Sequence, residues 1–269
     1  MPNESDLRDA GPVVDGRTYD ACYFARYGGR PYQRSAEWLT FFSGIADRIA
    51  ADIRPARVLD AGCALGLLVE TLRAKGIDAF GIDFSAFAIE HVYEPVKPFC
   101  RQASVTEPLR EQYDLIVCFE VLEHLTAADG ETAIANLCAH SRDILFSSSP
   151  DHYGEPTHLN TQPPEYWATW FARHDFYRDV DFDASFVAPW AVRFRHRTDP
   201  PHRIVADYER CFSKVVIERN HLRGLALAEQ AVLSRTTQEL VEARAGLAHA
   251  RETSWFWLAR RSLKWLSGR

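Results

Sequence analysis

The sequence predicts an α/β fold: a doubly wound, mainly parallel seven-stranded sheet, preceded by a helical segment and followed by a long helix. From Arg57 onward, short apolar runs alternate with amphipathic stretches, which is the pattern of strands joined by crossover helices. Residues 204–253 contain no proline and only two glycines, which predicts the long helix.

Seven apolar runs are the predicted strands, and the last two are expected to pair antiparallel. The helices between them are expected at 65–76, 85–93 and 131–141, with Ser85 as the N-cap of the second. A further helix is expected over 35–51, with Ser35 as its N-cap, and another from Pro163. The strands are RVLDAG (57–62), DAFGID (78–83), PFCRQA (98–103), YDLIVCFE (113–120), DILFSSS (143–149), FYRDVDF (176–182) and AVRFRHR (191–197).

These patterns divide the chain into five expected parts. Residues 1–17 are a polar tail, 18–54 an N-terminal helical lid, and 55–198 the α/β domain. Residues 199–253 form the long helix, in which Leu233, Leu240 and Leu247 recur every seven residues, so it is a candidate coiled coil and homo-oligomer interface. Residues 254–269 combine tryptophans and leucines with arginine and lysine, a composition typical of a helix lying on a membrane surface. Packing of either helix on its own domain is the alternative.

Composition excludes several classes of protein. The net charge of −6 argues against nucleic acid as a partner, because phosphate binding requires a Lys/Arg excess. The six cysteines form no CxxC pair and no His/Cys ligand spacing, so no metal site is expected. The polar N-terminus is no signal peptide, and no apolar run is long enough to span a membrane. We therefore expect a cytoplasmic protein with a peripheral contact at the inner membrane face.

The stretch VLDAGCALG (58–66) ends the first strand at the edge where doubly wound folds bind ligands. A dinucleotide fingerprint fails here, because Ala64 and Leu67 stand where it requires glycine, which disfavours an NAD-dependent oxidoreductase. Asp83 ends the second strand, about twenty residues after the loop, where an acid accepts hydrogen bonds from ribose. A nucleoside without a diphosphate fits both features, and S-adenosylmethionine is such a ligand.

VLDAGCALGLLVETLRAKGIDAFGID, followed by YDLIVCFEVLEHL, resembles the class I S-adenosylmethionine-dependent methyltransferases over residues 55–150. That family has a Rossmann-like fold, and the resemblance implies S-adenosylmethionine as the cofactor. It implies that Asp60 and the loop line the methionine end, that Asp83 holds the ribose and that Phe84 packs beside the adenine. Ser104 stands where the family often has an acid near the adenine. The implied cofactor residues are Asp60, Ala61, Gly62, Cys63, Gly66, Asp83, Phe84, Ser104, Phe119 and Glu120.

Methyl transfer from a sulfonium needs no acid for the leaving group, but a hydroxyl acceptor needs a base. The polar loop after the fifth strand, SSSPDHYGEPTHLNTQPPEYW, supplies His158 as the first candidate base and His152 as the second. Local hydrogen bonding within the loop is the alternative role of both. The expected substrate-binding residues are Tyr23, Tyr27, Arg30, His124, Asn160 and Tyr166.

The flanking segments, including THLNTQPPEYW and the ending SWFWLARRSLKWL, resemble a bacterial methyltransferase group associated with surface-glycan biosynthesis. This resemblance implies O-methylation of a sugar or glycan hydroxyl. Two alternatives stay open: a small metabolite, lipid or quinone as acceptor, and a non-catalytic cofactor-binding scaffold that acts through its long helix.

Overall fold

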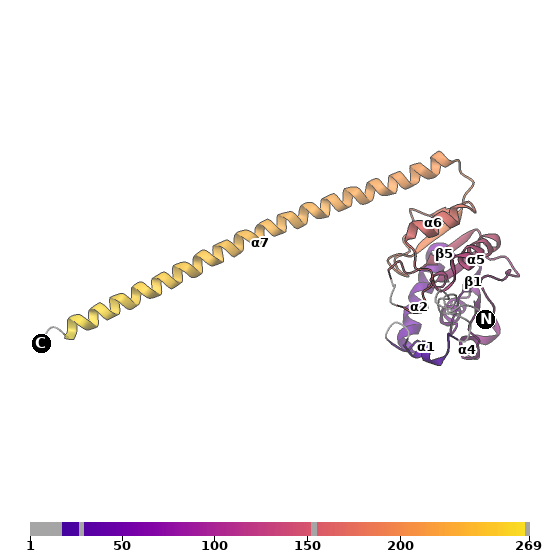
Figure 1. The fold of residues 1–269 in the computed structure, drawn as a ribbon, viewed down its shortest axis with the longest axis horizontal. Helices are drawn as coiled ribbons and strands as arrows, with labels where there is room; N and C mark the ends of the chain where they lie inside the picture. The colour runs from indigo at the N-terminus through magenta and orange to yellow at the C-terminus, as the bar shows by residue number, and fades with distance from the viewer. Residues whose placement is uncertain (1–17, 27–29, 152–154, 267–269) are drawn as a thin grey trace, which may run out of the picture. The chain divides into compact units, whose positions relative to one another are not determined.

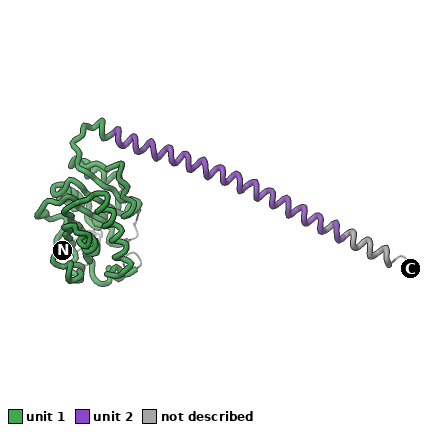
Figure 2. The backbone as a smooth tube through the Cα atoms, turned by 180° about the vertical axis from the view of Figure 1, so that it is seen from behind, with its two compact units in different colours: residues 1–204 green, residues 205–269 purple. Residues whose placement is uncertain are grey.

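The computed structural model describes residues 18–26, 30–151 and 155–266, with the side chains of residue 252 and of 256–266 left undescribed. The chain forms two compact units, residues 1–204 and 205–269, which Figure 2 colours separately. The first unit contains the sheet, and the described part of the second unit is helical (Figure 1).

The described residues form a seven-stranded sheet in the order β3-β2-β1-β4-β5-β7-β6, so the predicted fold class is confirmed. Strands β1 to β5 are parallel, and β7 pairs antiparallel with both β5 and β6. The order reverses between β1 and β4, which places the expected ligand edge after these two strands. The strands are β1 (Arg57–Ala61), β2 (Asp78–Asp83), β3 (Cys100–Gln102), β4 (Leu115–Phe119), β5 (Asp143–Ser147), β6 (Phe176–Arg178) and β7 (Val192–His196).

Helices cover both faces of this sheet because alternate strand residues point to opposite sides. One face buries Val58, Leu115 and Leu145 against α2 and α3, and the other buries Leu59 and Ile116 against α5 and α6. The helices of the first unit are α1 (Ala21–Arg26), α2 (Ala36–Arg48), α3 (Leu67–Ala74), α4 (Ala86–Glu90), α5 (Ala127–His140) and α6 (Pro164–Ala172). Shorter turns lie at η2 (Ile49–Ile53), η3 (Lys97–Phe99) and η4 (Leu122–His124).

Side-chain caps fix where several helices begin. The Ser35 hydroxyl accepts from the Trp38 N–H at the start of α2, and the Ser85 hydroxyl accepts from the Ala88 N–H at the start of α4, as the sequence predicts. Helix α5 begins four residues earlier than the expected 131, because the Thr126 hydroxyl caps it by accepting from the Asp129 N–H. Helix α4 is only five residues long, against the nine residues expected.

Helix α7 (Pro201–Leu266) is one continuous helix of 66 residues. Large apolar side chains along it are exposed, among them Phe212 at 64% and Leu233 at 66%. Among the described residues, no helix combines the length and apolar character needed to cross a membrane.

Candidate active site

The loop after β1 is shaped by glycines that lie against neighbouring side chains. The N–H groups of Gly62 and Cys63 both donate to the Ile82 carbonyl of β2, at 2.8 and 2.9 Å. Gly62 has φ +97°, and a Cβ there would overlap a methyl group of Val121, which follows β4. Gly66 has φ +70°, and a Cβ there would lie 3.0 Å from the Cys100 Sγ. The loop therefore needs glycine for conformation and for space, and it lies directly on the segment after β4.

Two carboxyl groups lie beneath this loop. Asp60 is 5% exposed, and burial together with the charge of Asp83 raises its pKa to about 8. Asp83 accepts from the N–H groups of Ala64 and Ser85, both at 2.8 Å, and so ties the loop to the start of α4. Burial raises the pKa of Asp83, while these two N–H groups oppose the increase. Both carboxyl groups therefore hold their protons to higher pH than an exposed aspartate does.

Glu120 and Glu123 follow β4 at the same edge of the sheet. Glu120 has φ +52°, and its Oε1 accepts from the Trp190 Nε1–H at 3.0 Å. Glu123, in η4, is fully buried, and its Oε1 accepts from the Ser149 N–H at 3.4 Å. Its Oε2 has no hydrogen-bond partner among the described residues. Burial and the neighbouring charge of Glu120 raise the pKa of Glu123 well above its usual value.

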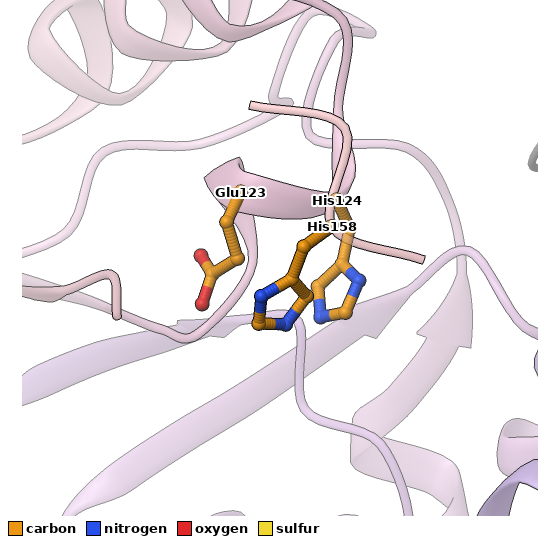
Figure 3. A group of neighbouring side chains, drawn as sticks. All are labelled: Glu123, His124 and His158. Atoms are coloured by element: carbon orange, nitrogen blue, oxygen red, sulfur yellow. The ribbon is translucent and has the colours of Figure 1, made fainter. Parts of the chain in front are cut away.

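His124 and His158 meet beside Glu123, and Figure 3 shows the three side chains next to one another, with His158 between Glu123 and His124. The two rings lie edge to face with centroids 4.6 Å apart. The His124 Nδ1–H donates to the Thr157 carbonyl at 3.2 Å, which leaves Nε2 as the unprotonated nitrogen of the neutral ring. Burial, together with the nearby His158, lowers the pKa of His124 to about 4, so this ring stays neutral across the physiological range. We call Glu123, His124 and His158 the EHH group.

The N-terminal segment reaches the EHH group through its aromatic residues. The Tyr19 ring lies edge-on to His124 at 5.6 Å, and the Tyr23 ring lies 6.5 Å from it. The Tyr19 carbonyl accepts from the Ser85 hydroxyl at 2.6 Å, beside the expected ribose site. Burial and the charges of Asp83 and Glu123 raise the pKa of Tyr19. Tyr19 thus connects the cofactor loops with the EHH group.

A family model described as a methyltransferase domain matches residues 32–179, more than half of the chain. The chain belongs to this methyltransferase family. The match covers β1 to β5, and with them the loop after β1, Asp83 and the EHH group. This match confirms the predicted class, a class I S-adenosylmethionine-dependent methyltransferase. It also disfavours the alternative of a non-catalytic scaffold.

Curated relatives share sequence with this chain, and a solved structure shares its fold. A ubiquinone biosynthesis O-methyltransferase of Methylococcus capsulatus is 27% identical over 147 residues, which are 49% of this chain and 57% of that protein. One from Alkalilimnicola ehrlichii is 32% identical over 119 residues, 41% of this chain and 44% of the relative. The methyltransferase thus spans about half the length of the curated relatives that it matches. A magnesium protoporphyrin IX methyltransferase from Synechocystis PCC 6803 with bound SAH shares the fold, with a TM-score of 0.53 at 16% identity, over 72% of this chain and all of that one.

The remaining predicted cofactor residues of the methyltransferase lie near the same edge of the sheet. Ala61 and Cys63 are buried, Phe119 is half-buried at the end of β4, and Phe84 is 47% exposed. Ser104 follows β3 and shares a hydrogen bond of 2.7 Å with the Thr106 hydroxyl. Phe84 therefore has an open face, whereas the Ser104 hydroxyl already has a partner.

The predicted substrate residues are only partly brought together. Tyr23 and His124 lie at the EHH group, whereas Arg30 pairs with Glu37 and stacks over Trp38. Asn160 is buried, and its N–H donates to the Glu123 carbonyl at 2.9 Å, which fixes the backbone beside His158. Tyr166 packs edge-on to Trp167 in α6. Tyr27 and His152 lie outside the described residues.

Two residues of the site were not predicted as site residues: Glu123 and Trp190. Glu123 stands in the EVLEHL segment, but only the fold brings its carboxyl group to a histidine thirty-five residues later in the sequence. Trp190 lies seventy residues after the Glu120 that it contacts. An acid directly before His124 was the one local signal that could have identified Glu123.

Proposed function

We propose that this chain transfers the methyl group of S-adenosylmethionine to a hydroxyl group of a sugar or glycan. The observation that carries the proposal is the EHH group at the carboxyl end of β4, next to the loop after β1. Val121, the residue after Glu120, packs on Gly62, so the two loops are in direct contact. The candidate base is therefore close to where the cofactor's methyl group would lie.

The chemistry needs a straight approach of the acceptor oxygen to the methyl carbon. The C–S bond breaks as the O–C bond forms, and the electron pair stays on sulfur, so the leaving group needs no proton. The hydroxyl group loses its proton, and His158 is the proposed acceptor of that proton. The residues assigned above to the methionine, ribose and adenine would hold the cofactor, with Asp60 facing its cationic end.

Two acceptors fit the proposed reaction, and a different observation supports each of them. The flanking segments resemble the methyltransferases of surface-glycan biosynthesis, which favours a sugar hydroxyl. The names of the curated relatives favour the second candidate, a quinone-type ring hydroxyl. Both are O-methylations, so the proposed roles of the EHH group are the same for either acceptor.

We also propose that α7 associates with α7 of a second copy as a parallel coiled coil. Most positions of one heptad frame along it are apolar, with Arg219, Glu229 and Thr236 as the exceptions. The exposed apolar side chains of this frame include Val215 and Leu240, at 57% and 51%. In a parallel pair, Glu218 would lie opposite Arg223 of the other helix, and Glu239 opposite Arg244. The frame positions are Val205, Tyr208, Phe212, Val215, Arg219, Leu222, Ala226, Glu229, Leu233, Thr236, Leu240, Ala243, Leu247 and Ala250.

We propose for two further segments, residues 18–54 and 254–269, the roles that the sequence predicts. Residues 18–54 would act as a lid, in keeping with the contacts of Tyr19 and Tyr23 to His124. Residues 254–269 would place the enzyme at the inner face of the membrane, because tryptophans among cations suit the interface.

Methyl transfer to a panel of nucleotide sugars, glycans and quinols tests the proposal. His158→Ala should lower turnover at least about a hundredfold while leaving S-adenosylmethionine affinity unchanged. His221→Ala, an exposed histidine of α7, is the control and should keep full turnover. If His158→Ala turns over like this control, the EHH group takes no part in the reaction and the proposal is wrong.

A further inference from the structure

We propose that the EHH group is a binding site for a divalent transition-metal cation, which binds the acceptor hydroxyl during methyl transfer. The inference rests on the proposed function and deepens it, because it assigns a ligand and a chemical role to the same three residues. The sequence predicts no metal site, since the ligands come from two separate segments.

The ligand atoms already lie close enough for one ion. One nitrogen or oxygen atom of each residue lies within 4.8 Å of the other two. Metal–nitrogen and metal–oxygen bonds of about 2.1 Å place two ligand atoms at most about 4.2 Å apart. Small side-chain rotations would therefore bring all three residues onto one cation.

The buried carboxylate of Glu123 is the second observation that points to a ligand. This side chain is fully buried, and its Oε2 atom lacks a hydrogen-bond partner among the described residues. A buried carboxylate oxygen without a partner is costly, and native proteins rarely leave one unsatisfied. Figure 3 shows this carboxyl group beside the His158 ring, with the His124 ring on the other side of His158. A cation between them would supply the missing partner.

The surroundings hold these ligands in place. His124 donates its Nδ1–H to the Thr157 carbonyl, which directs Nε2 outward, as metal-binding histidines are commonly oriented. The Ser149 N–H holds the other oxygen of Glu123. The hydrogen bond from the Asn160 N–H to the Glu123 carbonyl joins the segment that carries His158 to η4. The site is thus preorganised by backbone contacts on both sides.

The donor set selects the cation. Two imidazoles with one carboxylate suit zinc, iron, cobalt or manganese, whereas magnesium and calcium prefer oxygen ligands. Three protein ligands leave coordination positions open, as in catalytic rather than structural sites. An acceptor with two neighbouring oxygens, such as a vicinal diol or a catechol-type ring, could occupy two of these positions. Both candidate acceptors include molecules of this class.

A bound cation changes how the hydroxyl group is activated. It withdraws electrons from the oxygen and lowers the pKa of the hydroxyl, so the proton leaves to a water molecule. The oxygen then forms its bond to the methyl carbon, while the electron pair of the C–S bond stays on sulfur. The cation is neither oxidised nor reduced. In this form His158 binds the cation instead of accepting the proton, and a water molecule takes the place of His158 as the base.

Cobalt(II) titration of the full-length chain, freed of metal with a chelator, tests the inference. We expect about one Co²⁺ per chain, with visible bands of nitrogen and oxygen ligation. Thiolate charge-transfer bands in the near ultraviolet would instead place the ion on the free cysteines and overturn the inference. Glu123→Gln and His158→Ala should each weaken Co²⁺ binding at least about a hundredfold. Glu131→Gln and His221→Ala, which alter residues outside the EHH group, should bind Co²⁺ as the wild type does.

Activity measurements separate this inference from the proposed function. If the wild type binds no Co²⁺ and methylates a hydroxyl acceptor fully in the presence of chelator, the metal site is wrong and the proposed function stands. If Co²⁺ binds at the EHH group but no hydroxyl acceptor is methylated, the metal site stands and the proposed function is wrong. Circular dichroism shows whether Glu123→Gln is folded. If it is misfolded, Co²⁺ binding by His158→Ala decides whether the metal site exists, because His158 is only half-buried.

Discussion

Gly62→Ala is the substitution that most directly tests how the loop after β1 is built. Two separate costs follow from the structure. An alanine at φ +97° is strained by about 1–2 kcal/mol. Its Cβ would also overlap the Val121 side chain, with the Cβ and Cγ1 atoms of Val121 each 3.5 Å away, and overpacking of this kind costs about 1–3 kcal/mol. The expected total is about 2–5 kcal/mol.

Gly76→Ala supplies the matched control. Gly76 has φ +80°, but a Cβ there would meet no atom within 4 Å. It should therefore show the conformational cost alone, about 1–2 kcal/mol. For a unit of this size, each kcal/mol lowers Tm by about 2–4 °C, so Gly62→Ala should melt clearly below Gly76→Ala. Only Gly62→Ala should also weaken S-adenosylmethionine binding.

Thermal unfolding and cofactor calorimetry measure both effects. Val121→Ala removes the overlapping methyl group, so the double variant should recover about 1–3 kcal/mol relative to the sum of the single variants. Equal melting temperatures for Gly62→Ala and Gly76→Ala, or no recovery in the double variant, would refute the contact between the two loops.

Three further predictions concern pH, association and membrane contact. A cationic cofactor favours the ionised form of Asp60, whose pKa is about 8 in the free protein, so binding should release protons at pH 7. S-adenosylmethionine affinity should then rise with pH and level off above that pKa. Calorimetry in buffers of different ionisation enthalpy measures the release, and a wild type that releases no protons contradicts the assignment of Asp60. Leu233→Glu should dissociate the proposed coiled coil in sedimentation equilibrium. Leu227→Glu should not, because Leu227 is also exposed (58%, against 66% for Leu233) but lies outside the heptad frame. A monomeric wild type would rule the coiled coil out. Deleting residues 254–269 should release the enzyme from anionic vesicles, and unchanged binding would exclude that segment as the anchor.

The sheet could be predicted from sequence because its signals are local. Each strand is a short apolar run bounded by polar or glycine residues. In α3 the apolar residues recur at helical spacing, and this pattern stops at Gly76. The cofactor loop could be predicted for the same reason, since Asp60, Gly62 and Asp83 occupy fixed offsets from the strand ends. Element lengths were less predictable: β3 and β6 each span only three residues, where longer runs were expected.

The EHH group could be predicted only in part because it is formed by tertiary contacts. His158 was identified as a candidate base from the polarity of its loop alone. Its approach to His124 depends on a backbone hydrogen bond between Asn160 and Glu123 that no sequence spacing encodes. The burial that shifts the pKa of His124 and Glu123 likewise arises only when η4 and this loop pack together.

The roles proposed for the EHH group all serve methyl transfer from S-adenosylmethionine to a sugar hydroxyl. The most direct test incubates the purified full-length enzyme with methyl-labelled S-adenosylmethionine and a mixture of nucleotide sugars, glycans and quinols, and locates the label by mass spectrometry and NMR. We expect an O-methyl ether on a sugar, formed by the wild type and at least about a hundredfold more slowly by His158→Ala. Label found only on a quinol would shift the acceptor to the second candidate, and label on nitrogen or carbon would contradict the proposed O-methylation.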